Sequence, residues 1–547
     1  MKTQLKELVL KAAKDLCGGN LPAGFDFELS LPKDSAHGDF ACNVAMKISK
    51  IVGKNPRETA LLIQKAIEIS PSEIIEKIEI AGPGFINFYL KKSALGTIVL
   101  DILKNPEHFG KSDFGKGLKT VVEFVSANPT GPLTIAHGRQ AAIGDCLVRI
   151  LRAAGFDVSA EYYLNDAGRQ MRLLGGSVFA RYSAELGVPR DLPEEGYKGS
   201  YIFDLAKDLV KLRGNELLKL NEDDAVAQCT DYAKDTIMSW IKIDLETTHC
   251  HFDRFYSERT LYVENKVEEA LQLLKDRGYI YESEGGVWFR STDLGDDKDR
   301  VVKKSTGEYT YLAPDIAYHM TKYARGFRKI VNLWGPDHHG YIPRLKAACQ
   351  VLGYDADKIH VGIVQLSSLF RRGEPLKMST RAGEFVTYKE LYDEVGVDAA
   401  RLFFVLRRQE SQLDFDLEIA KEKSADNPVY YLQYAHARIC SLIEKADRKM
   451  AADPDVSLLK TPEEGDLIGT LAQFPDYIRQ SAQTLEPYRL VDYLRQLSAS
   501  FHSFYSQCRV VTDDAPLTDA RLALCRASQI VLRNGLELLG ISQPTSM

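Results

Sequence analysis

The chain has 547 residues, of which 45% are hydrophobic and 27% are charged, and its formal net charge is −6. This length is too great for one hydrophobic core and predicts about three or four domains, with the composition of an ordinary globular protein. The mildly acidic balance excludes a uniformly basic nucleic-acid binder, so any contact with nucleic acid needs a locally basic surface. No stretch reaches the roughly 18 apolar residues of a membrane span, and lysines interrupt the N-terminal helix where a signal peptide needs an apolar run. We therefore expect a cytoplasmic protein without membrane contact.

The nine cysteines are scattered and form no C-x-x-C pair. An odd number without paired spacing matches neither a disulfide framework nor a zinc or redox motif. Buried free thiols are expected.

Residues 1–117 are predicted to form an N-terminal α+β domain. TQLKELVLKAAKDL has the periodicity of an amphipathic helix, FDFELSLP alternates like a strand, and EKIEIAGPGFINFYL reads as two strands around a Gly-Pro-Gly turn. The polar, glycine-rich KSDFGKGLKT follows as a linker.

Residues 118–394 are predicted to form one α/β domain. VEFVSANPTGPLTIAHGRQ reads as a strand, a tight loop and a helix, and further strands are indicated in VSAEYYLNDAGRQ, RKIVNLWGPDHHGY and KIHVGIVQLSSLF. The helical IPRLKAACQVLG separates the last two, which gives the βαβ order of a doubly wound sheet. Residues from about 173 to 245 are charged and helix-prone, and we interpret them as a helical insertion.

Residues 395–547 are predicted to form a helical bundle. Strand signals vanish in this part, and helix-length apolar patterns follow one another from DAARLFFVLRR to ARLALCRASQIVLRNGLELLG.

The loop before the first helix of the α/β domain has the features of an anion site. Thr134 is placed to cap the helix, so His137 falls in its first turn, where free N–H groups and the helix dipole favour phosphate. A histidine near a helix start is more often a surface residue or a cap, so this motif alone does not establish a ligand site.

A second phosphate-binding candidate is the segment EPLKMSTRAGEF. Lys377, Ser379 and Arg381 lie between Gly373 and Gly383 in a flexible, donor-rich stretch that could close over a polyphosphate. The alternative is a solvated basic loop.

NPTGPLTIAHG and KMSTR resemble the two signature sequences, HIGH and KMSKS, of class I aminoacyl-tRNA synthetases. Further stretches are similar to the arginyl-tRNA synthetase family in the same order, namely VEFVSANPTGPL, EYYLNDAGRQ, YTYLAPDIAYH, WGPDHHGY, KMSTRAGEFVT and NPVYYLQYAHARI. The resemblance implies a Rossmann-like class I catalytic domain between a tRNA-contacting N-terminal domain and an anticodon-binding bundle. It also implies activation of L-arginine by ATP, with Mg²⁺, to arginyl-adenylate, and transfer to the 3′-terminal ribose of tRNA(Arg).

The resemblance assigns roles to individual residues. Those implied in catalysis are His137, Thr134, Lys377, Ser379 and Arg381. Those implied in ATP binding are Thr134, His137, Gly138, Asp337, His338, Lys377, Met378 and Ser379. Those implied in arginine binding are Glu123, Ser126, Asn128, Tyr311 and Asp315. A planar guanidinium is best held by carboxylates, which suits Glu123 and Asp315, although an edge-strand Glu and a helix-capping Asp are the plainer interpretations.

Four residues of one predicted helix are candidates for tRNA contact. Aromatic and cationic side chains can stack on unpaired bases, but aromatic residues at helical spacing more often belong to a core. The four are Tyr430, Gln433, Tyr434 and Arg438.

The two signatures depart from the class pattern. Thr134 stands where the first histidine is expected and Ala136 where a glycine is expected, so one charge-capable donor is missing and a methyl is added near the adenine. The last lysine of the second signature is also replaced, and we hypothesise that Arg381 supplies that cation.

The segment WGPDHHGY raises the question of a metal site. Adjacent histidines in an extended segment point to opposite faces, so we expect no metal there and favour contacts with nucleotide or arginine.

Two other functions fit parts of the sequence. A small-molecule nucleotidyltransferase shares the strand, loop and helix of the phosphate site but is usually shorter and has no C-terminal bundle. A catalytically inactive, RNA-binding relative of a synthetase would explain the altered signature at Thr134 and Ala136. A monomer is expected.

Overall fold

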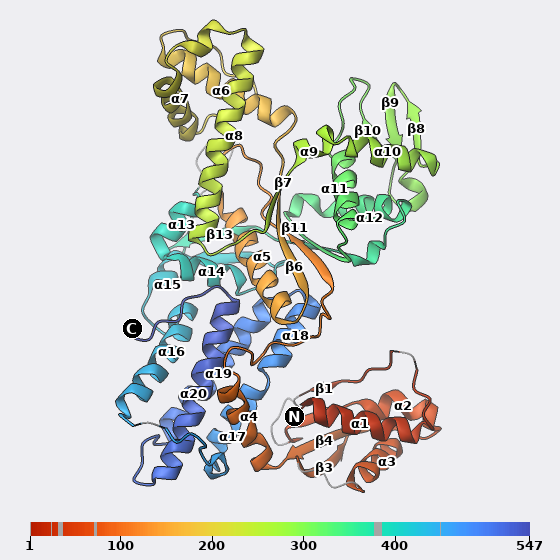
Figure 1. Ribbon diagram of the computed structural model, residues 1–547, viewed down its shortest axis with the longest axis vertical. Helices are drawn as coiled ribbons and strands as arrows, with labels where there is room; N and C mark the ends of the chain where they lie inside the picture. Colours follow the sequence, from red (N-terminus) through yellow and green to blue (C-terminus); the bar gives the residue numbers. More distant parts are fainter. Residues whose placement is uncertain (1, 23, 31–36, 70–73, 377–385, 449) are drawn as a thin grey trace.

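The computed structural model describes residues 2–22, 24–30, 37–69, 74–376, 386–448 and 450–547. Figure 1 shows an elongated molecule in which the N-terminal domain lies beside one end of a helical bundle and the α/β domain lies at the other end. Two separate extensions project from the α/β domain. The predicted multidomain α/β fold, with an N-terminal α+β domain and a C-terminal helical bundle, is confirmed.

The N-terminal domain packs three helices against a four-stranded antiparallel sheet of order β1-β2-β4-β3. Leu5 and Val9, one turn apart on the first helix, are buried in one core with Ile63 and Phe88. The predicted strands around the Gly-Pro-Gly turn form the β3–β4 hairpin. The elements are α1 (Lys2–Leu16), β1 (Leu29–Ser30), β2 (Phe40–Cys42), α2 (Val44–Val52), α3 (Pro56–Glu68), β3 (Ile75–Ala81) and β4 (Phe85–Leu90).

Helix α4 (Lys92–Lys104) follows this domain in the chain but packs elsewhere. It contacts α17 (Pro462–Ala472) and α20 (Ala515–Leu538) of the bundle. Its residues Ile98 and Ile102 are buried in the core that the bundle shares with the α/β domain. The bundle therefore contains a helix from the first quarter of the chain.

The α/β domain contains a five-stranded parallel sheet of order β12-β11-β5-β6-β7. The chain runs from the central strand β5 through α5 to β6 on one side, whereas β11 pairs with β5 on the other side, so the direction of winding changes between β5 and β11. Doubly wound sheets bind ligands at the carboxyl ends of the strands at such a point. The elements are β5 (Lys119–Glu123), α5 (Ile135–Ala153), β6 (Asp157–Leu164), β7 (Arg254–Ser257), α11 (Leu312–Ala324), β11 (Lys329–Trp334), α12 (Ile342–Val351) and β12 (Ile359–Ile363).

The first extension follows β6 and is helical, as the insertion at about 173 to 245 was predicted to be. Figure 1 shows it projecting at the top of the molecule. Contacts between the long last helix and the first hold it together. Its elements are α6 (Arg169–Glu185), α7 (Ser200–Arg213), η2 (Glu216–Lys219) and α8 (Glu222–Thr247).

The second extension follows β7 and is absent from the sequence-based prediction. It carries a three-stranded antiparallel sheet of order β10-β9-β8, whose strands have four residues each. Strands this short do not show a clear alternation of apolar and polar residues. The elements are α9 (Glu258–Val263), α10 (Lys266–Asp276), β8 (Ile280–Ser283), β9 (Gly286–Phe289) and β10 (Arg300–Lys303).

A third small sheet joins the α/β domain to the bundle. Strand β13 (Ser367–Arg371) forms an antiparallel pair with β14 (Glu374–Pro375) and a parallel pair with β15 (Leu413–Asp416). The expectation of no strand beyond residue 395 is therefore wrong at β15, whose four residues are too few to give a strand signal. Three helices accompany this sheet, namely α13 (Tyr388–Val395), α14 (Val397–Val405) and α15 (Leu417–Lys421).

The rest of the bundle consists of long helices. DLIGTLAQFPDYIRQSAQ reads as one helix but forms two, because Pro475 lies in the first turn of the second and cannot continue the first. All nine cysteines are free, and seven of them are buried. None of the helices in the described part of the chain is long and apolar enough to cross a membrane. The remaining helices are α16 (Pro428–Lys445), α18 (Phe474–Thr484) and α19 (Tyr488–Gln507).

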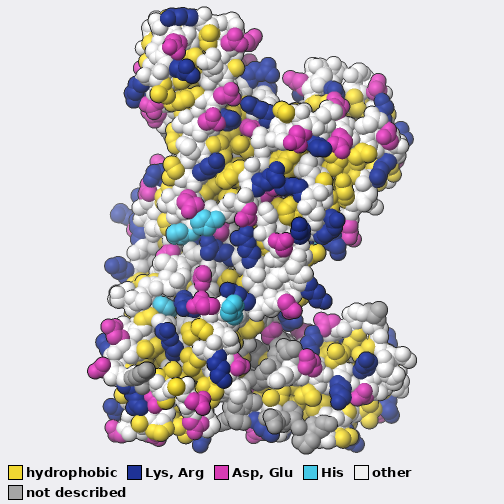
Figure 2. Space-filling view, in the orientation of Figure 1, with side chains coloured by type: hydrophobic (Ala, Val, Ile, Leu, Met, Phe, Trp, Pro, Cys, Tyr) yellow, Lys and Arg dark blue, Asp and Glu magenta, His cyan; other side chains and the backbone are white. Residues whose placement is uncertain are grey.

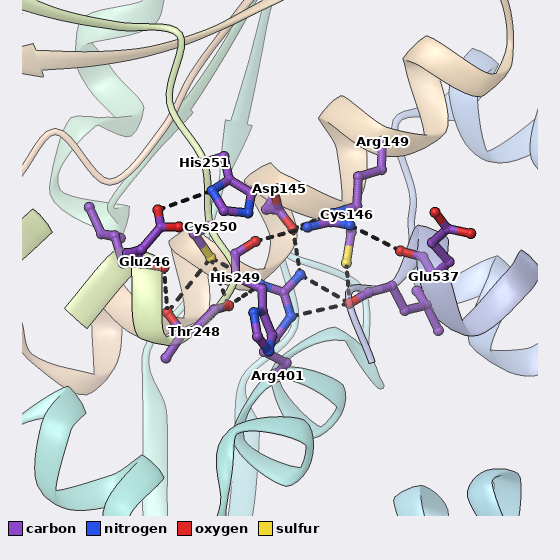
Figure 3. A network of polar contacts seen from close by, with 12 residues as sticks. Asp145, Cys146, Arg149, Glu246, Thr248, His249, Cys250, His251, Arg401 and Glu537 are labelled. Atoms are coloured by element: carbon purple, nitrogen blue, oxygen red, sulfur yellow. Dashed lines mark hydrogen bonds and ion pairs between the residues drawn. The ribbon is translucent and has the colours of Figure 1, made fainter. Parts of the chain in front are cut away.

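The guanidinium of Arg401, on α14, is fully buried where the α/β domain meets the bundle (Figure 3). It pairs with Asp145 of α5 at 2.5 Å and donates to the carbonyls of Thr248, at the end of α8, and Leu539, at the end of α20. Helix C-termini carry partial negative charge, so one cation satisfies two helix ends and a carboxylate. Gly540 has φ 67°, and a Cβ there would lie 2.2 Å from Nη2 of the guanidinium.

We expect Arg401→Met to lower the free energy of unfolding by about 3 kcal/mol, because it leaves buried acceptors without a donor. Urea denaturation followed by circular dichroism measures this. Arg149→Met is the matched control, since Arg149 also pairs with Asp145 but is partly exposed, and it should cost about 1 kcal/mol or less. Equal midpoints for the two variants would contradict the role given to Arg401.

Candidate active site

The loop that leaves β5 has an unusual backbone conformation. Val125 and Ser126 have φ values of 67° and 41°, which is rare for side-chain-bearing residues and rarest for a β-branched one. Hydrogen bonds hold the loop in place: the hydroxyl of Tyr162 donates to the carbonyl of Ala127 at 2.8 Å, and the N–H of Tyr163 donates to Ser126 Oγ at 3.1 Å. Strain of this kind persists only where surrounding contacts impose it, and it occurs most often at functional sites.

The start of α5 holds His137 in a defined protonation state. The N–H of Thr134 donates to Nδ1 of His137 at 3.2 Å, and the Thr134 hydroxyl lies 3.1 Å from the same nitrogen. Burial lowers the pKa of His137 from 6.5 to about 4. The ring is therefore neutral at pH 7, with Nδ1 as acceptor and the proton on Nε2. His137 offers an anion a hydrogen bond and no charge, which refines its predicted electrostatic role.

Gly138 allows close packing at the second turn of α5. A Cβ at this position would lie 2.4 Å from the ring of Tyr388, at the start of α13. The N–H of Tyr388 donates to the carbonyl of Leu133 at 2.8 Å, and Thr387 forms an isolated bridge with Thr134. The chain is thus anchored beside the start of α5 just after residue 385. The predicted Lys377, Met378, Ser379 and Arg381 lie outside the described residues.

Glu123 ends β5 and is buried with a lysine. Lys322 of α11 donates to Oε2 of Glu123 at 2.5 Å and to Oδ1 of Asn332 at 2.9 Å, and its side chain is fully buried. The hydroxyl of Ser126 donates to the other carboxylate oxygen of Glu123 at 3.2 Å. The predicted residues Glu123 and Ser126 are therefore in direct contact.

Asp315 faces the same region from the first turn of α11. It accepts a hydrogen bond from the hydroxyl of Tyr341 at 2.7 Å. Burial, together with the charges of Glu123 and Glu258, raises the pKa of Asp315 from 3.8 to about 7. Tyr311 lies one turn before Asp315 and is 66% exposed. The structure thus collects three carboxylates close enough to influence one another, which is an environment suited to a cation.

Two residues beside Glu123 and Asp315, namely Glu258 and Lys322, were missed by sequence reasoning. Glu258 follows the carboxyl end of β7, and hydroxyls of Tyr163 and Tyr262 donate to it at 3.1 and 3.0 Å. Glu258 lies at the carboxyl end of a parallel strand, as Glu123 does, and this position was a signal for a site residue. Lys322 lies seven residues after Asp315, which places the two on one stripe of α11.

The other predicted residues lie along the same sheet edge or close to it. The amide of Asn128 donates to Oε1 of Gln170 at 2.6 Å. Asp337 and His338 follow β11 and are exposed. They lie in a 3₁₀ helix, η4 (Pro336–Tyr341), so the expected extended segment is wrong. Neighbouring side chains of such a helix point about 120° apart, so the two adjacent histidines still diverge.

The predicted tRNA-contacting residues lie on α16 and differ in accessibility. Tyr430 and Tyr434 stack with ring centroids 5.8 Å apart, and the guanidinium of Arg438 lies 5.7 Å from the Tyr434 ring. Tyr434 is 37% exposed. Gln433 is buried, and its amide donates to Asp398 at 2.8 Å and to the C-terminal tail. Figure 2 shows basic side chains gathered across the middle of one face, despite the acidic net charge.

A histidine-bearing helix start at the winding change of a parallel sheet, with a helical bundle after it, places the chain among the class I aminoacyl-tRNA synthetases. Residues 99–443 match the profile described as tRNA synthetases class I (R), catalytic domain. Residues 3–90 match the arginyl tRNA synthetase N terminal domain, and residues 432–547 match the DALR anticodon binding domain. The fold is also similar to that of Thermus thermophilus arginyl-tRNA synthetase, with a TM-score of 0.79 and 22% identity over 100% of both chains.

Sequence relatives narrow this class to one family. The chain is 48% identical to an arginine–tRNA ligase of Citrifermentans bemidjiense over 100% of both proteins. It is 45% identical to arginine–tRNA ligase 1 of Halalkalibacterium halodurans over 100% of this chain and 99% of that protein. The chain belongs to the arginyl-tRNA synthetase family.

The raised pKa of Asp315 predicts a stability signature in the ligand-free protein. The folded state keeps the proton up to about pH 7, whereas the unfolded state releases it near pH 3.8. The stability contributed by this proton is therefore fully present below pH 3.8, falls as the pH rises from 3.8 to 7, and is lost above pH 7. We expect Asp315→Asn to gain about 3 kcal/mol of stability relative to wild type between pH 5 and pH 8, because wild type loses about 1.4 kcal/mol per pH unit up to pH 7.

Thermal denaturation of both proteins between pH 5 and 8 measures this difference. Asp357→Asn serves as the control, because that residue is exposed. A difference between Asp315→Asn and wild type that does not change with pH would contradict the predicted ionisation.

Proposed function

We propose that the chain ligates L-arginine to tRNA(Arg) with consumption of ATP. The carboxylate of arginine attacks the α-phosphate, pyrophosphate leaves, and a terminal ribose hydroxyl of the tRNA then takes the arginyl group from the adenylate. The observation that carries the proposal is the pair of carboxylates Glu123 and Asp315 beside a helix start that offers donors to phosphate. One stretch of chain from β5 to α5 thus contributes to both half-sites.

The amino-acid half-site is assigned to residues of β5, its loop and α11. Asp315 and Glu123 pair with the guanidinium, whose planar fork can reach two carboxylates at once. Tyr311, exposed at the start of α11, packs against the side chain of the substrate. Ser126 and Asn128 hold its α-amino and α-carboxylate groups. A neutral side chain in this pocket would leave buried carboxylates unmatched, which excludes it strongly.

The ATP half-site is assigned to the start of α5 and the adjacent sheet edge. His137 donates from Nε2 to a phosphate oxygen, Thr134 and the N–H groups around Gly138 add neutral donors, and Asp337 and His338 contact the nucleotide. This site is expected to act by positioning the reactants and stabilising charge.

The second signature is expected to supply the positive charges. Lys377 and Arg381 neutralise charge on the phosphates, while Met378 and Ser379 complete the contact. The anchoring of Thr387 and Tyr388 beside α5 supports this assignment. Mg²⁺ is expected to enter with ATP, where phosphate and water oxygens would hold it.

The tRNA is assigned to the domains on either side of the catalytic one. In the proposed division, residues 1–117 touch the outer corner of the tRNA, residues 118–394 carry the chemistry, and residues 395–547 bind the anticodon. Tyr430, Tyr434 and Arg438 stack on unpaired bases, and Gln433 supports α16 from within. We propose a monomer that works in the cytoplasm.

Aminoacylation of bulk tRNA with each of the twenty amino acids tests the function. We expect charging with L-arginine alone, and it should require ATP. Charging with another amino acid would overturn the specificity, and nucleotidyl transfer without any amino acid would favour the nucleotidyltransferase. No charging at all would favour the inactive RNA-binding relative.

Asp315→Asn and Glu123→Gln should each raise the KM for L-arginine by about a hundredfold or more, because each removes a charged partner of the guanidinium. The KM for ATP should change little. Asp357→Asn is the control and should match wild type. An unchanged KM for arginine in both variants would remove these two residues from the pocket.

Tyr434→Ala and Arg438→Ala should each raise the KM for tRNA by about tenfold, since a stacked base contributes roughly 1–3 kcal/mol. Arginine and ATP parameters should stay the same. Arg509→Ala, which removes an exposed arginine elsewhere on the bundle, is the control. A loss no larger than that of the control would place the anticodon elsewhere.

A further inference from the structure

Lys322 is a fully buried lysine whose side chain lies among the carboxylates of the pocket. It shares one stripe of α11 with Asp315 and His319, at intervals of four and three residues. Burying an ammonium is costly unless it is paired and hydrogen-bonded, so its partners define its role.

The three N–H groups of the ammonium have three partners. One donates to Oε2 of Glu123 at 2.5 Å and one to Oδ1 of Asn332 at 2.9 Å. The ammonium also lies 4.2 Å from the centroid of the Tyr318 ring, at cation–π distance.

Asn332 and His319 extend this network back to the start of α11. Nδ2 of Asn332 lies 2.9 Å from Nε2 of His319, and Nδ1 of His319 lies 2.9 Å from the carbonyl oxygen of Asp315. Asn332 donates to Nε2 and Nδ1–H donates to the carbonyl, so His319 is neutral. The ammonium is therefore held in one place by α11, which presents Asp315, and by the paired strands β5 and β11, which present Glu123 and Asn332.

We propose that Lys322 is a positioning residue for arginine recognition: its ammonium fixes one oxygen of Glu123, leaves the other for the guanidinium, and supplies the internal counter-charge that lets Asp315 face the substrate as a carboxylate. This inference rests on the proposed roles of Glu123 and Asp315.

The geometry at Glu123 supports the first part. Lys322 occupies Oε2, whereas Oε1 receives, from the part of the chain that the structure describes, only a neutral hydroxyl at 3.2 Å, from Ser126. A guanidinium that pairs with Oε1 must take its second carboxylate from another residue, and its planar fork suits Asp315 in that role. Glu123 thus presents one oxygen in a fixed orientation.

The charge balance around Asp315 supports the second part. Two carboxylates oppose its ionisation and one ammonium favours it, so loss of the ammonium shifts the balance toward the protonated acid. The titratable or charged groups that bear on Asp315 come from β5, β6, α9, α11 and η4, and they are Glu123, Tyr163, Glu258, Tyr262, His319, Lys322 and Tyr341.

The test is calorimetric titration of the full chain with L-arginine between pH 5.5 and 8.5. The wild-type affinity should rise about tenfold per pH unit at low pH and level off above an inflection near pH 7. The reason is that Asp315 pairs with the guanidinium in its ionised form and not in its protonated form. Lys322→Met removes the ammonium, and Lys322→Gln removes its charge but keeps a hydrogen-bond donor. Both should move the inflection up by at least one pH unit and weaken binding at pH 7 at least tenfold.

Lys329→Met is the matched control, since Lys329 begins β11 at the opposite edge of the sheet, with its ammonium over the Phe156 ring. Its inflection should match wild type. Two folded Lys322 variants whose inflections stay within about 0.3 pH units of wild type would overturn the proposal.

A variant that removes a charge of the opposite sign covers the case in which neither Lys322 variant folds. Glu123→Gln removes a carboxylate that opposes the ionisation of Asp315, so the inflection should move down, and an unchanged or higher inflection would overturn the proposal. The Glu123→Gln/Lys322→Met double variant removes one charge of each sign and should return the inflection close to wild type. Asp315→Asn tests the proposed arginine pocket separately from Lys322. If this variant keeps the affinity and the inflection of wild type, the pocket itself is overturned. If arginine binding is lost, the pocket stands, and the Lys322 and Glu123 variants decide the role of Lys322.

Discussion

The buried guanidinium of Arg401 is the interaction on which the arrangement of catalytic domain and bundle depends. It joins Asp145 on α5 to the ends of α8 and α20, three segments far apart in the chain. Each partner carries negative charge that would be costly to bury alone. His137 lies in the first turn of α5, and the same helix passes through this junction two turns later. The last helix of the bundle therefore helps to fix the helix that is proposed to bind ATP.

The group of charged residues around Glu123 and Asp315 is arranged on a different principle. Three carboxylates and Lys322 are held close together by elements from separate parts of the chain, and Val125 and Ser126 adopt strained conformations beside them. Such an arrangement costs stability in the free protein and is compensated by the large cores around it. In the proposed function the guanidinium of arginine reduces this cost when it binds, so binding and relief of repulsion would occur in one step.

Much of the fold could be predicted from periodicity and turn chemistry, because β5, α5, β6 and the bundle helices are long or bounded by clear caps. The four-residue strands β8, β9, β10 and β15 could not, since their pairing depends on distant partners. For the site, Glu123 and Asp315 stand in recognisable positions. The buried contact between Lys322 and Glu123, the neutral state of His137 and the inward amide of Gln433 depend on tertiary packing, which spacing along one chain does not reveal.

Helix α4 has a consequence for how the protein can be divided. Its residues Ile98, Val99 and Ile102 belong to the core of the bundle, although the helix directly follows the N-terminal sheet. A shortened chain that begins at residue 118 would lack this helix and expose an apolar groove between α17 and α20. A chain that begins just before α4 would keep that core closed, so the separable N-terminal unit ends with β4.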